Sequence, residues 1–214
     1  MPAREDHETR RRLIEAAAHL FAERGFDNVS IRDICAAANA NVAAVNYYFH
    51  DKWGLYKELI QEIVQDSQKF IEEVHSAPPG SPPDERLRNY IHRYLHYGLT
   101  SHKASWRGKL MGREMVDPTP GLDLFIDGVI RPNSTRVGEI VSELMGLPPS
   151  DGRVGACVGS IQTQIVGYFG PVVRRLVPNL EFTSEVIEGI ANHITAFSLA
   201  GIRAIAQQSV EVHK

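Results

Sequence analysis

A short tract near the N-terminus carries several side chains that are suited to contacting DNA. Positions 41–52 read NVAAVNYYFHDK, which places two amides, two phenols and an ammonium group close together. The Asn46 amide can pair with two groups of an adenine, and a small side chain such as Val42 can contact a thymine methyl group. Hydroxyl and ammonium groups can hold phosphate oxygens. The predicted DNA-contacting residues are Arg32, Asn41, Val42, Ala44, Asn46, Tyr47, Tyr48 and Lys52.

The charge of the chain excludes one class of nucleic-acid protein. The 214 residues carry a formal net charge of -3, and the sequence pI is about 6.3. Such a chain is not a general nucleic-acid coat, although a sequence-specific reader needs only a local basic footprint. Residues 1–55 are not basic either, because acidic side chains slightly outnumber basic ones there. The DNA prediction therefore depends on the pattern of residues and not on charge.

The predicted elements around this tract form a helix-turn-helix. Apolar spacing of three and four predicts a helix over 8–24, and Ser30 has the spacing of a capping box for the next helix. Asn39 tolerates the left-handed backbone of a tight turn, and Asn41 can cap a helix over 42–48. This second short helix is the element that enters the major groove in such proteins. The expected core residues are Phe21, Ile34, Val45 and Phe49, while Tyr48 fits the core and the DNA surface equally well.

Helical periodicity continues through the rest of the chain, and no segment has the alternation of a strand. The Pro- and Gly-rich stretch at 77–83 cannot be helical, and Gly170–Pro171 should kink a later helix. We therefore predict an all-α protein of about nine helices. The remaining predicted helices cover 52–74, 84–101, 105–116, 122–145 with a bend near Pro132, 151–177, and a last one that Thr183 or Ser184 caps and that runs to 207.

The string IRDICAAANANVAAVNYYFHDKWGLY at 31–56 closely resembles the DNA-binding domain of the TetR family of repressors. LFAERGF at 20–26 matches the first helix of that family. Asn39 stands where the family usually has a turn glycine, and Asn46 stands where it often has tyrosine. The resemblance covers about residues 8–56. It implies a DNA-binding domain at 1–52 and a homodimeric repressor that leaves a palindromic operator when a small molecule binds.

Residues 106–120, WRGKLMGREMVDPTP, look like part of the CecR-type C-terminal domain of one TetR branch. This resemblance implies an effector-binding and dimerisation domain at 53–214, with a loop at 76–83 after the connecting helix. Ligand pockets are mostly apolar with a few polar groups, and the candidates here are Tyr94, Tyr97, Trp106, Met111, Arg113, Glu114, Gln162 and Phe169. The alternative is that Arg113 and Glu114 form ion pairs and that the aromatic side chains belong to the core.

Small residues recur on the last two long predicted helices. Gly155 and Gly159 lie on one of them, and Ala196 and Ala200 lie on the other. Small side chains permit close helix crossings, and two operator half-sites require a twofold protein. We therefore predict a homodimer with a four-helix interface within 151–205. The alternative is a monomer that buries the same face internally.

Other chemistries are less well supported by the residues. His92 and His96 have the i, i+4 spacing of metal ligands, but zinc needs a further ligand, such as His102 or Glu114. We predict polar-face histidines, and no metal or other cofactor. No nucleophile–base pair or phosphate-binding loop suggests an enzyme. The rival functions are an all-helical enzyme and a constitutive DNA-binding dimer without an effector.

The cysteines and the apolar runs suggest the compartment. Cys35 and Cys157 are far apart and have no CxxC partner, which fits a reducing cytoplasm. No apolar run reaches the roughly 18 residues of a membrane span, and the N-terminus lacks the apolar region of a signal peptide. We therefore expect a cytoplasmic protein without a membrane partner.

Overall fold

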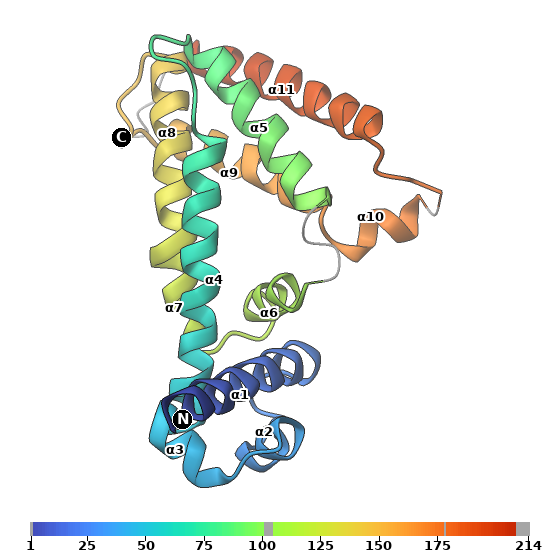
Figure 1. The fold of residues 1–214 in the computed structure, drawn as a ribbon. Helices are drawn as coiled ribbons and strands as arrows, with labels where there is room; N and C mark the ends of the chain where they lie inside the picture. Colours follow the sequence, from blue (N-terminus) through green and yellow to red (C-terminus); the bar gives the residue numbers. More distant parts are fainter. Residues whose placement is uncertain (1, 101–104, 178, 209–214) are drawn as a thin grey trace, which may run out of the picture. The chain divides into compact units, whose positions relative to one another are not determined.

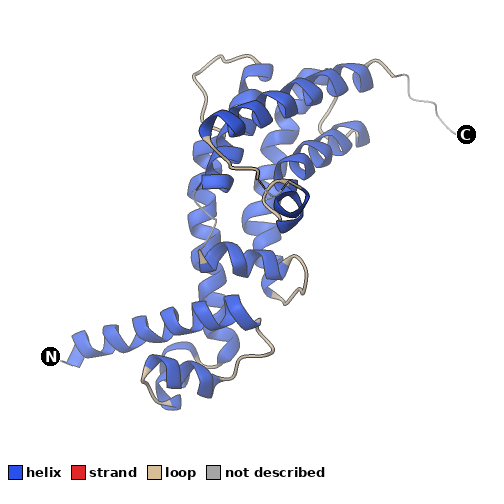
Figure 2. Ribbon diagram, turned by 90° about the vertical axis from the view of Figure 1, so that its right-hand side faces the viewer, coloured by secondary structure: helices blue, strands red, loops and turns tan. Residues whose placement is uncertain are grey.

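Figure 1 shows the computed structural model, which describes residues 2–100, 105–177 and 179–208. Within these ranges every regular element is a helix and no strand is present (Figure 2), which confirms the predicted all-α class. The elements are α1 (Pro2–Arg24), α2 (Ile31–Ala38), α3 (Val42–Phe49), α4 (Lys52–Val74), α5 (Pro83–Thr100), α6 (Trp106–Glu114), α7 (Gly121–Phe125), the π-helical η1 (Ile126–Ile130), α8 (Arg131–Met145), α9 (Gly152–Gly167), α10 (Pro171–Leu176) and α11 (Ser184–Ala206).

Side-chain caps set the limits of the two short helices α2 and α3. The Asp33 backbone N–H donates to Ser30 Oγ at 3.2 Å, and the Ser30 N–H donates to the Asp33 carboxylate at 2.8 Å. Asn39 ends α2 with a left-handed φ of 47°. The Asn41 side chain accepts from the Ala44 N–H at 2.9 Å and starts α3. The predicted capping box, turn and cap are therefore confirmed.

The chain divides into two compact units. The first consists of the described parts of 1–69 and 104–130, and the second of the described parts of 70–103 and 131–214. Helix α4 contributes to both, because the division falls at residue 69 within it. The sequence predicts a functional boundary after residue 52, between DNA binding and effector binding, whereas the packing boundary falls after residue 69. The functional boundary remains a prediction.

The first unit has its core where α1, α2, α3 and α4 meet. Phe21, Ile34 and Val45 are fully buried there, and Phe49 is nearly so, as predicted. Tyr56 packs edge-on against Phe21, with 4.9 Å between ring centroids. Helix α6 packs along α1 in the same unit. The core therefore holds the helix-turn-helix and α6 together.

The second unit is built from α5, α8, α9 and α11, and α5 packs along α11 (Figure 1). The predicted interruption before α5 is present. The helix predicted over 151–177 is two helices, because residues 168–170 separate α9 from α10. Pro171 follows directly as the first residue of α10, a position where proline's missing N–H costs nothing. Its fixed geometry starts a new helix and does not merely kink the old one.

Near Pro132, where the sequence predicts a bend, the π-helical segment η1 ends two residues before the proline. Proline has no backbone N–H, so the carbonyl four residues earlier, that of Gly128, cannot receive an α-helical bond from it. Gln68 Nε2 donates to that carbonyl instead, at 3.2 Å. A Cβ at Gly128 would lie 2.4 Å from Val64 Cγ1, so glycine permits the close approach to α4.

Candidate DNA-binding site and C-terminal groove

Helix α3 presents one face to solvent and buries the other. Val45 and Phe49 are buried, whereas Val42, Asn46 and Tyr47 are exposed, Tyr47 to 72%. The exposed face therefore combines an amide that can read a base edge, a phenol that can hold a phosphate and an apolar methyl-contacting group. Ala44 is half-buried on α3, and Arg32 is exposed at the start of α2. These five predicted DNA-contacting side chains are accessible in the structure.

Tyr48 differs from its neighbour Tyr47. Its side chain is half-buried, and its hydroxyl donates to the Asp6 carboxylate on α1. This hydrogen bond is the main reason that the pKa of Tyr48 rises to about 12. The hydroxyl is therefore engaged within the first unit, and it would have to leave Asp6 before it could donate to a phosphate.

Lys52 is held by the loop between α1 and α2. Its Nζ donates to the carbonyls of Phe26 and Val29 at 3.0 and 3.1 Å, and it lies 4.1 Å from the centre of the Phe26 ring. An ammonium group has three N–H donors, and two of them serve these carbonyls. Lys52 thus has a clear structural role, which pattern reasoning did not foresee.

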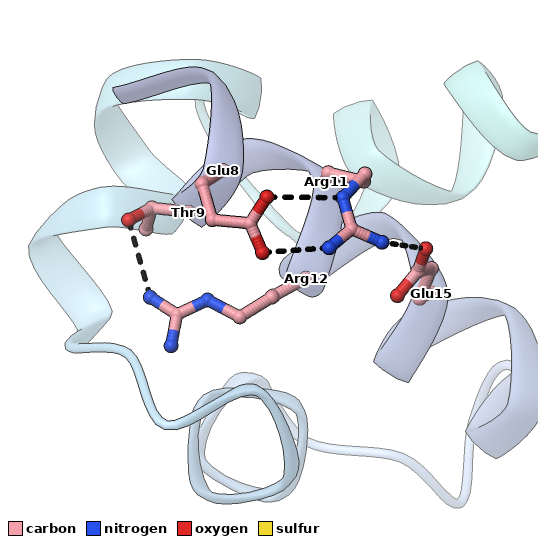
Figure 3. Close-up of polar contacts among 5 residues, drawn as sticks. All are labelled: Glu8, Thr9, Arg11, Arg12 and Glu15. Atoms are coloured by element: carbon pink, nitrogen blue, oxygen red, sulfur yellow. Dashed lines mark hydrogen bonds and ion pairs between the residues drawn. The ribbon is translucent and has the colours of Figure 1, made fainter. Parts of the chain in front are cut away.

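The arginine tract of α1 is balanced by acidic side chains. Figure 3 shows Arg11 between Glu8 and Glu15, with 2.6 and 2.5 Å between the paired atoms. Arg10 pairs with Glu58 on α4. These contacts offset the charges of Arg10 and Arg11 locally.

Arg113 and Glu114, two predicted pocket residues, hold the first unit together. Arg113 donates to the carbonyls of Ala22 and Glu23 at the C-terminal end of α1. Glu114 is 1% exposed and accepts from the Tyr56 hydroxyl and from the N–H and hydroxyl of Thr119. Burial, and then the Glu114 contact, raise the pKa of Tyr56. The partners of both side chains are neutral groups, so the contacts are internal hydrogen bonds and not the ion pairs considered as the alternative.

The predicted pocket residues fall into two groups in the structure. Trp106, Met111, Arg113 and Glu114 belong to the first unit, and Tyr94, Tyr97, Gln162 and Phe169 belong to the second. The second group lies in or beside an aromatic cluster. Phe70 stacks on Tyr97 with 3.8 Å between centroids, and Tyr94 lies parallel to Phe169 at 6.1 Å. A Cβ at Gly98 would lie 2.3 Å from Phe169 Cζ, so this ring packs directly on the α5 backbone.

A partly buried set of hydrogen-bonded polar groups lies in the second unit, and sequence reasoning singled out only Gln162 among them. The Asn133 amide donates to the Tyr90 hydroxyl at 3.0 Å, and its carbonyl lies 2.9 Å from His75 Nε2. Nearby, Ser134 donates to Gln162 at 3.1 Å. Burial lowers the pKa of His75, because it disfavours the charged ring. The available signal was an Asn on the otherwise apolar face of a predicted helix.

A groove of about 740 Å³ lies between the end of α4, α5 and α11, and we call it the α5–α11 groove. The predicted pair His92 and His96 lines it together with Tyr97. Within the described ranges no group of three or more His, Cys, Asp or Glu side chains could hold a metal ion. His102, the further ligand considered above, lies outside the described residues. The groove therefore offers room for a molecule, with polar and aromatic walls.

Known family models match both the N-terminal and the C-terminal part of the chain. The model described as the C-terminal domain of the HTH-type transcriptional dual regulator CecR matches residues 83–202, more than half of the chain. The model for bacterial regulatory proteins of the tetR family matches residues 13–59. The chain belongs to the TetR family, in the branch with a CecR-type C-terminal domain. These families are transcriptional regulators and not enzymes, so this TetR-family protein is a DNA-binding regulator.

Individual relatives agree with this assignment. The probable HTH-type transcriptional regulator YttP of Bacillus subtilis is 34% identical over 42% of this chain and 43% of its own length. The dual regulator CecR of Shigella flexneri is 28% identical over 69% of each chain. The solved structure of a putative transcriptional regulator from Pseudomonas aeruginosa covers 95% of this chain and 94% of its own, with 18% identity and a TM-score of 0.69. That structure supports the fold alone. None of the described helices is both long and apolar enough to span a membrane.

Proposed function

We propose that this protein is a ligand-responsive repressor that binds a palindromic operator as a homodimer and is released by a small molecule. The exposed face of α3 carries the proposal, because Asn46 and Tyr47 are accessible while Val45 anchors the helix. Val42, Ala44 and Arg32 complete the proposed DNA contacts. Asn41 acts as the cap of α3. Tyr48 can bind a phosphate only if its hydroxyl leaves Asp6, and Lys52 only through the N–H donor that the loop carbonyls do not use. Such a regulator acts in the cytoplasm.

The exposed faces of α9 and α11 support the homodimer. Among the residues that the structure describes, no heavy atom lies within 4 Å of a Cβ built at Gly155 or Gly159, so this stripe of α9 packs against none of them. On α11 the Phe197 side chain is 63% exposed, and on α9 Val166 is 55% exposed. A second copy that placed its own small residues against these helices would cover the apolar side chains and join two reading heads.

Helix α6 offers a route by which a ligand could change DNA binding. Arg113 ties α6 to the last carbonyls of α1, and Glu114 ties it to α4 through Tyr56. A shift of α6 would therefore move the helices that carry the reading head. Coupling of this kind between effector and operator is typically about 1–3 kcal/mol.

The test combines ligand screening with operator binding. Purified protein is heated with a panel of compounds, and a compound that binds the folded state raises the melting temperature. Each binder is then added to an operator that the protein has selected from random DNA, and anisotropy reports the affinity. Release by a binder supports the proposal. Unchanged operator affinity with every binder would instead favour a constitutive DNA-binding dimer without an effector. The close packing of Phe169 on Gly98 is consistent with that alternative, because it leaves no space between the ring and α5.

A further inference from the structure

We propose that the α5–α11 groove binds a planar aromatic molecule that carries a positive charge. This inference rests on the proposed function, since it assigns a site and a chemical class to the effector. All residues that line the groove belong to the second compact unit. Its apolar lining consists of Phe70, Val74, Tyr97, Ile187 and Ala191.

The aromatic part of the ligand follows from the pair formed by Phe70 and Tyr97. Their ring planes are 19° apart and their centroids are separated by 3.8 Å, so they form one flat stack at the groove. Tyr94 meets Phe70 edge-on at 5.2 Å and supports that ring from the side. Aromatic rings prefer offset-stacked or edge-on contacts with other rings, and the face of an aromatic ring attracts a cation. A flat ring with an attached cationic group satisfies both preferences.

The charge of the ligand follows from the acidic lining. Glu73 on α4 and Glu188 on α11 are the acidic residues of the groove lining. Arg93 also lines the groove, and its Nη1 donates to the carbonyls of Glu73 and Ser76 at 2.5 and 3.1 Å. Those carbonyls close the C-terminal end of α4, the negative end of the helix dipole, and so offset the arginine charge. The carboxylates therefore favour a cation and disfavour an anion.

His92 adds a hydrogen-bond acceptor to this lining. Its Nδ1 lies 3.5 Å from a Glu188 carboxylate oxygen. Its Nε2 is shielded from solvent and has no hydrogen-bond partner among the residues that the structure describes. A neutral ring that keeps its proton on Nδ1, toward Glu188, leaves Nε2 as an acceptor. A buried polar atom without a partner is unfavourable, so a ring movement that exposed Nε2 to a ligand N–H group would gain affinity.

The experiment uses three small probes with the same ring and different charges: 4-aminobenzamidine, 4-aminobenzamide and 4-aminobenzoate. Each is titrated into the full-length protein by calorimetry. We expect the cationic amidine to bind most tightly, the neutral amide more weakly and the anionic benzoate most weakly. Replacing both carboxylates, Glu73→Gln with Glu188→Gln, should weaken amidine binding about tenfold and leave amide binding unchanged. Glu185→Gln, an exposed position on α11 outside the groove lining, is the matched control.

The aromatic stack is tested separately, because Tyr97→Leu should weaken the amidine and the amide alike. Tighter binding of the benzoate, or an equal loss in Glu185→Gln and in the double variant, would overturn the inference. The operator assay keeps the two proposals apart. If other compounds release the operator while the amidine does not bind, the proposed function stands and this inference fails. If the amidine binds with the expected charge order but leaves operator affinity unchanged, the groove assignment stands and ligand-responsive release through it fails.

Discussion

Glu114 in the first unit and Glu188 in the second are both acidic residues on helices, yet their surroundings are opposite. Glu114 is 1% exposed and is surrounded by donors from Tyr56 and Thr119, whereas the Glu188 side chain is 66% exposed at the wall of an open groove. Polar groups of the first unit join its own helices to one another. Several of the second unit's polar groups face space that another molecule can fill. The comparison suggests that the reading head must be rigid, while the C-terminal unit keeps exposed surface for partners.

The largest expected effect concerns the exposed stripe of α9. Gly159→Leu should weaken the proposed dimer, because the side chain would hold the two subunits apart, although leucine is the better helix former by about 1 kcal/mol. Operator affinity should fall by several orders of magnitude, since one reading head makes only half of the contacts. Analytical ultracentrifugation over a concentration series measures the dimer.

Gly112→Leu is the control for this variant, because Gly112 is also helical and exposed, with open space around it. A Gly159→Leu protein that remains dimeric at wild-type concentrations would place the interface elsewhere. Circular dichroism identifies a variant that has simply unfolded, and Gly159→Ala then serves as the milder replacement.

The next effect tests the rigidity of the first unit. Glu114→Ala should lower the free energy of unfolding by about 3 kcal/mol, because the buried hydroxyl of Tyr56 and the donors of Thr119 lose their acceptor. Urea denaturation measures the loss. Lys109→Ala, at an exposed position on the same helix, is the control and should change stability by less than about 0.5 kcal/mol. Equal losses in both variants would contradict a structural role for Glu114.

A smaller effect is expected at the recognition helix. If Asn46 reads an adenine, Asn46→Ala should cost about 1–3 kcal/mol on the selected operator and relax the preference at one base pair of each half-site. Its side chain is exposed, so the replacement should leave the stability of the fold unchanged. Anisotropy titrations with single-base operator variants measure both quantities. An equal loss on random DNA would make Asn46 a backbone contact.

Replacing Lys52 tests whether its side chain only stabilises the loop between α1 and α2 or also contacts DNA. Lys52→Ala should lower stability by about 1 kcal/mol, because the carbonyls of Phe26 and Val29 lose a charged donor. If its remaining donor also holds a phosphate, binding to all sequences weakens similarly and the salt dependence decreases by about one unit of slope. Denaturation and salt titration are measured on the same preparation. Lost stability with an unchanged slope would remove Lys52 from the DNA interface.

The smallest expected effect is a change in the free energy of unfolding caused by protonation of His75, and it occurs only below neutral pH. Its pKa is lowered mainly by burial, so the unfolded chain binds a proton more readily than the folded protein. The stabilising contribution is therefore complete above the ordinary value of 6.5 and is lost as the pH falls below it. Nearby Glu72, Arg136 and Glu139 face the same ring. Urea unfolding between pH 7 and 5 should show a steeper loss in the wild type than in His75→Gln, and parallel curves would contradict this assignment.

The sequence alone determined the features that depend on residues close together in the chain. Ser30 and Asp33 are three residues apart, and Asn41 caps a helix that starts at the next position, so their hydrogen bonds follow from local spacing. Helical periodicity likewise placed Phe21 and Val45 in the core. The exposed face of α3 followed from the same periodicity, and the TetR resemblance followed from a contiguous string.

Only the tertiary structure decided the contacts that join distant segments. Lys52 meets carbonyls 26 and 23 positions away, and Arg113 meets Ala22 across 91 positions. No spacing rule predicts such pairs, because they depend on how whole helices pack. The α5–α11 groove has the same origin, since its walls come from Glu73, His92 and Glu188 on three separate helices. Local hydrogen bonding can be read along the chain, whereas the shape of a cavity exists only once the helices have packed.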